Sequence, residues 1–221
     1  MISAVRSEFF TEAKILWRIT CRLLALALIG AHIAACVTRP TRPLSDAQNA
    51  RGQDRLDQRE AQLREVNAFR LRGRIAISDG KDSGSGRFEW DQRSAGFTLN
   101  FTAPVTGQNW RLESQPGQAV LIESNGAVRV AEDAQSLLAR ELNWQLPTAA
   151  MRYWVLGSRA PGSESSVEFN SEGQLSVLRQ NGWEIRYPAF DVNQDPPLPT
   201  KVFARSGEHQ VRISVRNWSL H

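Results

Sequence analysis

The sequence predicts a mainly β protein, folded as a curved, barrel-like antiparallel sheet of roughly ten or eleven strands with covering helices. Three observations support this prediction. Apolar and polar residues alternate with a period of two along most of the chain after residue 68. Turn dipeptides such as Asp79-Gly80 and Asn125-Gly126 separate the alternating runs. Each run is apolar on one side only, so each strand has one face for a core and one for water.

Before the sheet, the first 35 residues have the features of a bacterial export signal. Arg18 and Arg22 precede an apolar run over 23–35, which is shorter than the roughly 20 residues that span a bilayer as a helix. The run ends in Ile-Ala-Ala-Cys, which resembles the lipobox of bacterial lipoproteins. That resemblance implies cleavage before Cys36 and attachment of lipid to its sulfur, whose thiolate is the nucleophile. The alternative is ordinary signal cleavage beside an incidental cysteine.

The sequence therefore divides into three segments: a lipoprotein signal peptide (1–35), a lipidated N-terminus with a flexible polar tether (36–52), and a folded domain (53–221). Within the domain, residues 55–69 predict a helix with a thin apolar stripe. Leu56, Leu63 and Val66 form this stripe, which can cover a sheet or the mouth of a barrel.

The remaining elements follow in order. Predicted strands cover 69–78, 87–91, 97–102, 110–113, 119–122, 128–130, 167–169, 175–179, 183–187, 202–204 and 211–215. Two helices interrupt them: 132–142, with acidic residues in its first turn, and 148–156, with Thr148 as cap and Gly157 as stop. Ser83–Gly86 is glycine-rich but leads into no helix, so we expect a flexible turn and no phosphate loop.

Composition excludes most catalytic and metal chemistry. The chain has two cysteines and three histidines, too few for a Cys/His metal site, and it lacks nucleotide-binding and nucleophile-elbow motifs. Its net charge of +4 is spread along the chain, unlike a nucleic-acid footprint. We expect no metal, no cofactor, no nucleic acid and no enzyme activity. The acidic residues that could form an acid-base pair, without any spacing that marks one, are Glu123, Asp133, Glu168 and Asp191.

Several stretches between residues 65 and 218 resemble the LolB family of outer-membrane lipoprotein receptors, in order and with similar gaps. They read LRGRIAIS, GRFEW, TAPVTGQNWRLESQPGQAVL, AEDAQSLLARELNWQLPTAAMRYWVLG, NGWEIRYPAF, PPLPTKV and VRISVRNW. The most specific are MRYWVLG, GWEIRY and RNW. The resemblance implies an unclosed antiparallel β-barrel, helices that cover its opening, and an apolar cavity for acyl chains.

The resemblance also implies a loop that helps to place cargo in the membrane. Here this loop is Ala103–Gly107, and its key residues are Pro104, Val105 and Gly107, with valine where the family usually has leucine. Aromatic residues at alternating strand positions more often fill an ordinary core than line a ligand site. For this chain, a filled core and a ligand cavity both remain possible. The candidates for lining the cavity are Phe88, Trp90, Phe97, Leu99, Phe101, Trp110, Met151, Trp154 and Trp183.

By resemblance, the protein is expected to be a monomeric, lipid-anchored receptor on the periplasmic face of the outer membrane. Its expected partners are a LolA-like periplasmic lipoprotein carrier, the acyl chains of lipoproteins, and outer-membrane lipid. Two alternatives remain. One is the soluble type of carrier, against which Cys36 argues because a shuttle cannot be anchored. The other is an unrelated envelope lipoprotein or enzyme built on a β-sheet.

Overall fold

A computed structural model describes residues 44–104 and 107–221, and Leu44–His221 forms one compact unit. Three predictions therefore lie outside the described residues: the signal peptide, the lipid attachment at Cys36, and the insertion role of Val105. All the buried apolar residues of the core cluster belong to this unit. Residues 44–221 thus contain the packing that stabilises the described fold, which makes this fragment suitable for experiments.

The described residues contain eleven strands in one antiparallel sheet, which confirms the predicted fold class. The strands are β1 (Ala68–Ser78), β2 (Ser83–Arg93), β3 (Gly96–Thr102), β4 (Asn109–Gln115), β5 (Gln118–Glu123), β6 (Val128–Ala131), β7 (Ser165–Phe169), β8 (Leu175–Gln180), β9 (Trp183–Asp191), β10 (Leu198–Ser206) and β11 (His209–Leu220). Their order is β6-β5-β4-β3-β2-β1-β11-β10-β9-β8-β7. Because β6 and β7 are the two ends of this order, the barrel is not closed.

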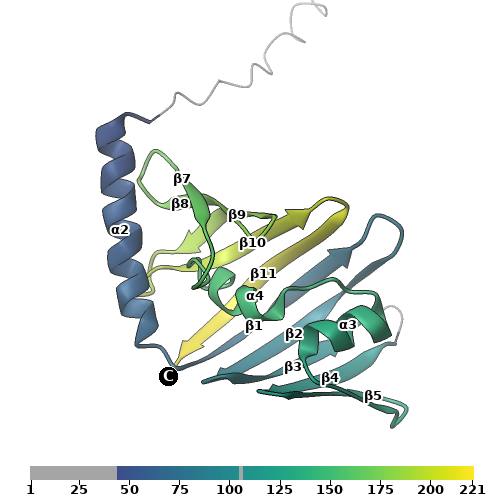
Figure 1. Cartoon of the computed structure of the whole chain (residues 1–221). Coiled ribbons are helices and arrows are strands. Elements are labelled where there is room, and N and C mark those ends of the chain that lie inside the picture. Colours follow the sequence, from purple (N-terminus) through teal and green to yellow (C-terminus); the bar gives the residue numbers. More distant parts are fainter. Residues whose placement is uncertain (1–43, 105–106) are drawn as a thin grey trace, which may run out of the picture. The chain divides into compact units, whose positions relative to one another are not determined.

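Three helices accompany the sheet in the described part of the chain: α2 (Asp46–Arg64), α3 (Ala134–Leu142) and α4 (Thr148–Trp154). In Figure 1, α3 and α4 lie in front of the strands, on the inner side of the curved sheet, and α2 stands beside β7 and β8. Helix α3 packs on β4, β5 and β6, and α2 contacts β7. Helices α3 and α4 therefore lie over the inner face of the sheet, whereas α2 lies along its β7 end.

The predicted alternation is realised in β1 and β2. Leu71 and Ile75 of β1 are buried, whereas Arg72 and Arg74 between them are exposed. The core cluster is built from the apolar side of such strands and from the inner sides of the helices. Burying one large apolar side chain contributes about 1.5–3 kcal/mol, so this one-sided pattern fixes which face of the sheet turns inward.

Helix α2 begins nine residues earlier than predicted. Ser45 and Gln48 form a capping box, in which the Gln48 backbone N–H donates to Ser45 Oγ and the Ser45 N–H donates to Gln48 Oε1. Gly52 lies within the helix and makes room for Phe169 of β7, because a Cβ at Gly52 would lie 2.6 Å from that ring. The assignment of residues 46–52 to a flexible tether is therefore wrong.

The glycine-rich stretch Ser83–Gly86 is the start of strand β2, so the predicted flexible turn is also wrong. Its glycines make room for aromatic rings. A Cβ at Gly84 would lie 3.0 Å from Trp144, and one at Gly86 would lie 2.7 Å from the Phe101 ring and 2.4 Å from the carbonyl oxygen of Thr102. Close approach of neighbouring groups is thus the reason for glycine here.

The ends of the two inner helices differ. Asp133 caps α3 and accepts a bond of 2.8 Å from the Ser136 N–H, which lowers the pKa of the Asp133 carboxyl. Helix α4 starts after Pro147 without a side-chain cap, so the prediction of Thr148 as cap is wrong. Gly157, predicted as the stop, follows α4 with φ of +72°, a conformation that favours glycine.

Candidate functional site

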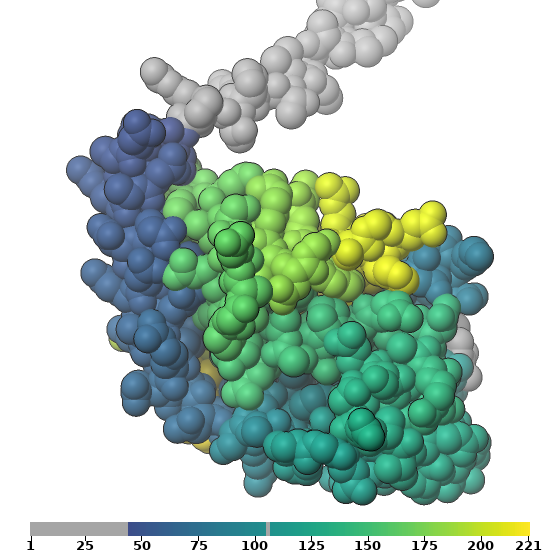
Figure 2. Space-filling view, in the orientation of Figure 1, coloured from purple at the N-terminus to yellow at the C-terminus, as the bar shows by residue number. Residues whose placement is uncertain are grey.

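A small apolar cavity lies between the inner face of the sheet and the helices. Its volume is about 20 Å³. Except for Thr148, its lining residues are all apolar: Ile75, Phe88, Trp90, Phe97, Leu99, Phe101, Trp110, Leu138, Trp144, Leu146, Thr148, Met151 and Ile213. In the space-filling view, the atoms of residues 131–155, teal to green, lie over this part of the sheet (Figure 2).

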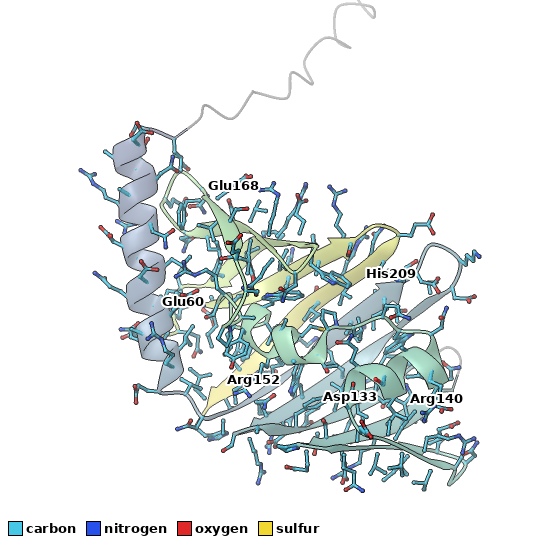
Figure 3. The ribbon with its side chains drawn as sticks, in the orientation of Figure 1. Glu60, Asp133, Arg140, Arg152, Glu168 and His209 are labelled. Atoms are coloured by element: carbon cyan, nitrogen blue, oxygen red, sulfur yellow. The ribbon has the colours of Figure 1, made fainter. Side chains whose placement is uncertain are left out.

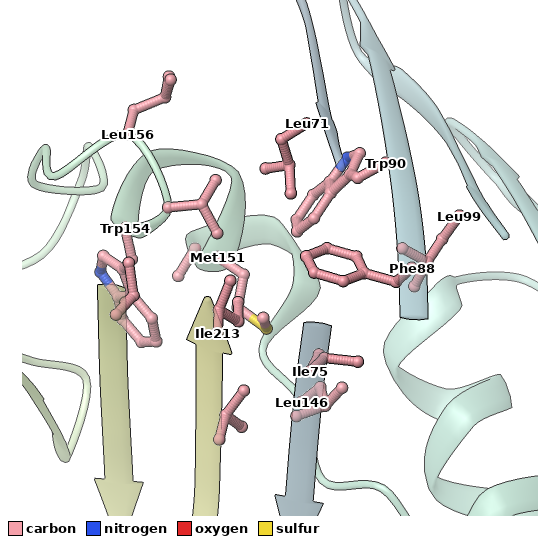
Figure 4. Close-up of a cluster of buried hydrophobic side chains, with 14 of the residues drawn as sticks. Leu71, Ile75, Phe88, Trp90, Leu99, Leu146, Met151, Trp154, Leu156 and Ile213 are labelled. Atoms are coloured by element: carbon pink, nitrogen blue, oxygen red, sulfur yellow. The ribbon is translucent and has the colours of Figure 1, made fainter. Parts of the chain in front are cut away.

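The structure brings seven of the nine predicted lining residues to this cavity: Phe88, Trp90, Phe97, Leu99, Phe101, Trp110 and Met151. Trp154 and Trp183 are not among its lining residues. They pair with each other at 6.1 Å between ring centroids. Figure 4 shows Trp154 directed away from Phe88 and Trp90, at the other end of α4 from the cavity. The assignment of these two tryptophans to this cavity is therefore wrong.

Trp144 closes one side of the cavity. It belongs to residues 143–147, which connect α3 to α4 and which we call the cover segment. Its indole packs edge-on against Phe101 and Trp110 at 5.4 and 5.5 Å, and those two rings stack on each other at 4.9 Å. Leu146 of the same segment is buried over the cavity.

Sequence reasoning missed the cover segment as part of the site. The available signal was the pair Trp144 and Leu146 in a short connection between two helices. Large apolar residues in such a connection have no helix or strand face of their own to bury, so they must cover something else. Their side chains close the cavity from the side that the strands leave open.

A second contact holds the cover segment at the rim of the sheet. Asn143 Nδ2 donates a hydrogen bond to Asp79 Oδ2 in the turn between β1 and β2. Asn143 has φ of +56°, in the left-handed region, and its side chain is exposed. This hydrogen bond therefore links the cover segment to the β1–β2 turn at its exposed edge, away from the apolar contacts of Trp144 and Leu146.

A buried glutamine orients one wall of the cavity. The indole N–H of Trp90 donates to Gln92 Oε1 at 3.2 Å, and Gln92 Nε2 donates to the carbonyl oxygens of Ser94 and Gly96 at 3.0 and 2.9 Å. Gln92 is 2% exposed, so each polar atom is satisfied without water. Because this network binds the indole N–H, the apolar part of the Trp90 ring is free to line the cavity.

Helix α4, which carries Met151 into the cavity, is fixed at its C-terminal end by Arg59 of α2. The guanidinium donates to the carbonyl oxygens of Leu156, Gly157 and Pro197, with distances of 2.7 Å to Gly157 and 2.9 Å to Pro197. It also lies over the Phe190 ring at 5.6 Å. Burial lowers the pKa of Arg59 to about 10. The arginine joins α2, the end of α4 and the segment before β10.

Two further buried hydrogen bonds fix α4. The hydroxyl of Tyr187 donates to the carbonyl oxygen of Trp154 at 3.1 Å, and burial raises the pKa of Tyr187. The indole N–H of Trp154 donates to Gln180 Oε1 at 3.0 Å. Trp154 thus anchors α4 to the sheet, which explains why it does not line the cavity.

The loop predicted to contact membrane follows β3. Ala103 is buried, and it accepts a hydrogen bond of 2.9 Å from the Gly107 N–H. Pro104 and Gly107 are exposed, and Gly107 has φ of +72° with open space around it. The described parts of the loop are therefore anchored at Ala103 and reach into solvent on either side of Val105.

Two of the four acidic residues considered for catalysis serve other contacts. Asp133 caps α3, and Glu168 pairs with Arg179 at 2.6 Å. Figure 3 shows Glu168 near β7 and Asp133 near α3, in different parts of the molecule. Among the described residues no group of acidic, cysteine or histidine side chains has the arrangement of a metal site. In the same residues, no helix has the length and hydropathy of a membrane span.

Comparison with known proteins gives consistent results. Residues 67–218 match the family model described as outer membrane lipoprotein LolB. The chain is 34% identical over 200 residues to outer-membrane lipoprotein LolB of Alkalilimnicola ehrlichii, and 30% identical over 201 residues to that of Marinobacter nauticus. These alignments cover 90% and 89% of this chain and 97% of each relative.

A solved structure shares the fold at much lower sequence identity. It is a DUF1329 family protein from Desulfovibrio piger, with a TM-score of 0.50 and 9% identity. The match covers 81% of this chain and 94% of that one. At this identity the likeness extends to the fold alone.

Proposed function

Because this chain belongs to the outer-membrane lipoprotein LolB family, we propose that it accepts lipoproteins from a periplasmic carrier and inserts them into the outer membrane. The protein is itself an outer-membrane lipoprotein, like its relatives. In the proposed cycle, acyl chains of the cargo enter between the sheet and the cover segment. They then leave for the bilayer, without any covalent step.

The observation that carries this proposal is the apolar cavity under the cover segment. Its lining is almost wholly apolar, yet its volume of about 20 Å³ has room for about one water molecule. An acyl chain therefore needs the cover segment, and Met151 of α4 beside it, to move away from the sheet. We infer that the structure shows the cover segment closed over the cavity.

The energy of transfer explains why cargo passes from cavity to cavity. Burying one methylene contributes about 0.8 kcal/mol, so a chain of roughly fifteen contributes about 12 kcal/mol. Several such chains exposed to water together would exceed the practical limit of non-covalent binding, about 18–21 kcal/mol. Direction then follows from affinity for the acyl chains, which we expect to rise from the carrier to this protein and to the membrane.

Anchoring at the target membrane supports the same role. We propose that lipid on Cys36 keeps the receptor at the bilayer, since two acyl chains anchor a protein stably whereas one does not. The chain between Cys36 and Ser45 then acts as the tether that precedes α2. An anchored receptor meets the membrane at a high effective concentration, which a soluble carrier does not.

The direct test is transfer of a labelled lipoprotein from a purified carrier to the full-length mature protein in liposomes. We expect the label to reach the receptor first and the bilayer afterwards, without added nucleotide. Intact-mass analysis of the same preparation checks the lipid on Cys36. Failure of the label to leave the carrier would show that the protein is not the receptor.

Val105→Glu is expected to separate uptake from delivery. Because a carboxylate is costly to place among acyl chains, delivery to liposomes should slow by roughly tenfold while uptake from the carrier is unchanged. Both rates are measured with the labelled lipoprotein. Gln108→Glu adds the same charge at an exposed position directly after the loop and should leave delivery within about twofold. Equal rates in Val105→Glu and the parent would remove Val105 from the mechanism.

Asn143→Gly is expected to speed entry into the cavity. The substitution removes the bond to Asp79 and suits the left-handed backbone at this position. An exposed hydrogen bond is worth the lower part of the usual range, so a fluorescent acyl probe should enter roughly threefold faster. Gln145→Gly makes the cover segment equally flexible but keeps the bond. If both variants take up the probe at the same rate, the Asn143 contact does not hold the cover.

A further inference from the structure

The outer face of the sheet carries a row of basic side chains across neighbouring strands. Register places Arg87 of β2 opposite Arg74 of β1, Arg74 opposite Ser214 of β11, and Ser214 opposite Lys201 of β10. Arg74, Arg87 and Lys201 are all exposed. We call Arg74, Arg87 and Lys201 the basic row. It lies on the face opposite the cavity, because the neighbours Ile75, Phe88 and Val202 are buried.

The basic row differs from the other charges on this face, most of which are paired. Arg72 binds Glu89 at 2.8 Å, Arg70 binds Asp91 at 2.5 Å, and Arg179 binds Glu184 at 3.2 Å. Within the described part of the chain, none of the three side chains of the basic row forms an ion pair. Their positive charge is therefore available to a partner outside the molecule.

Two of these cations face each other directly. Arg74 and Arg87 occupy opposite positions of the β1–β2 ladder, and like charges placed so are destabilising in a sheet. Folding of the domain therefore gains nothing from this pair. An anionic partner that lies over both guanidinium groups would relieve the repulsion and gain charge-assisted hydrogen bonds.

The next row along the strands adds an aromatic residue. Arg212 of β11 lies opposite Phe203 of β10, with its guanidinium 6.0 Å from the centre of the Phe203 ring. Phe203 is 36% exposed, one of the few large apolar side chains on the surface of the described residues. Cations beside an exposed aromatic ring suit the boundary between lipid headgroups and acyl chains.

We propose that the outer face of the sheet binds anionic phospholipid headgroups through Arg74, Arg87, Lys201 and Arg212, with Phe203 at the interface. The inference rests on the proposed function, since it needs a receptor that stays at a bilayer. Such a receptor meets lipid headgroups at high effective concentration, and basic side chains near an anionic surface are attracted to it. This favours lipid over an acidic protein as the partner.

The position of the basic row fits delivery of cargo. Arg87 lies opposite Thr102, the last residue of β3, directly before the exposed Pro104 loop. Contact of the row with headgroups would therefore bring that loop to the bilayer surface. The cavity lies on the other face of the same sheet, where Phe101 lines it. The outer face would then set the orientation in which the cargo leaves.

The test compares vesicle binding of the fragment 44–221, which lacks the anchor and both cysteines. Vesicles consist of phosphatidylcholine alone or of phosphatidylcholine mixed with phosphatidylglycerol. We expect binding only to the mixed vesicles, weakening as sodium chloride rises. Because each basic residue near an anionic surface contributes about one kcal/mol, Arg74→Gln/Arg87→Gln should bind roughly 30-fold more weakly. Arg51→Gln/Arg64→Gln removes two exposed charges from α2 and should bind like the parent.

The same variants separate the possible outcomes. Arg74→Gln/Arg87→Gln relieves a like-charge pair, so its melting temperature should not fall, and it should bind the fluorescent acyl probe like the parent. Vesicle binding that ignores phosphatidylglycerol, or equal losses in both double variants, would overturn the proposal. Normal vesicle binding with impaired transfer from the carrier would assign the row to an acidic protein instead. If the unmodified fragment binds no acyl probe, the proposed function is refuted. The vesicle-binding result would still decide the headgroup proposal.

Discussion

Trp144→Ala is expected to raise the affinity of the fragment 44–221 for a fluorescent fatty-acid probe by roughly 30-fold. The indole of Trp144 packs against Phe101 and Trp110 only while the cover segment is closed. Its loss should destabilise that state by about 2 kcal/mol, less than for a fully buried tryptophan because Trp144 is partly exposed. A binding-competent open state then becomes more populated by the corresponding factor. Titration of the probe measures the change.

Trp183→Ala is the matched control for this prediction. Trp183 is also a tryptophan of the core cluster, 9% exposed, but it packs against Trp154 and does not line the cavity. Its replacement should lower the free energy of unfolding without raising probe affinity. If both variants gain affinity alike, the probe is binding to loosened protein in general. If neither gains affinity, the cover segment does not limit access to the cavity.

Arg59→Met is expected to lower the stability of the fold strongly. The variant keeps the apolar stem but leaves the carbonyl oxygens of Leu156, Gly157 and Pro197 without their donor. Hydrogen bonds from a charged group contribute about 1.5–3 kcal/mol each, and part of that offsets the cost of burying the guanidinium. We therefore expect the free energy of unfolding to fall by about 3 kcal/mol. Urea denaturation of fragment 44–221 measures it.

Arg51→Met provides the comparison on the same helix. Arg51 is exposed, so its replacement should change the free energy of unfolding by no more than about 0.5 kcal/mol. Arg59→Lys should lie between the two, since an ammonium cannot reach three carbonyl oxygens in the fork geometry of a guanidinium. Equal stability of Arg59→Met and Arg51→Met would show that these carbonyl contacts do not hold α2 and α4 together.

The strands were predictable because burial in a sheet repeats every second residue. Alternation in β1 and β2 identified the inward positions Leu71, Ile75, Phe88 and Trp90, and the number of runs matched the eleven strands. The start of α2 could also have been predicted, since Ser45 and Gln48 have the spacing of a capping box. Both signals are local, so they can be found without knowledge of the rest of the fold.

The site was predictable only in part because alternation says which face a side chain occupies, not what lies over that face. Trp154 and Trp183 are buried as expected, yet they pack beside Gln180 away from the cavity. Trp144 lies in a connection without periodicity, and its role depends on packing against Phe101 of β3 and Trp110 of β4. Such contacts join residues that are distant in sequence, so no local sequence pattern predicts them.

By itself, the sequence determined the strand-rich class of the chain, the inward side of its strands, and a resemblance that the family match confirms. Periodicity and motif residues carry this information locally. Only the tertiary structure decided that the cavity is closed by Trp144, that Arg59 joins α2 to α4, and that Arg74, Arg87 and Lys201 fall in one row. These features depend on strand register and on packing between distant segments, and both are settled only when the whole sheet has formed.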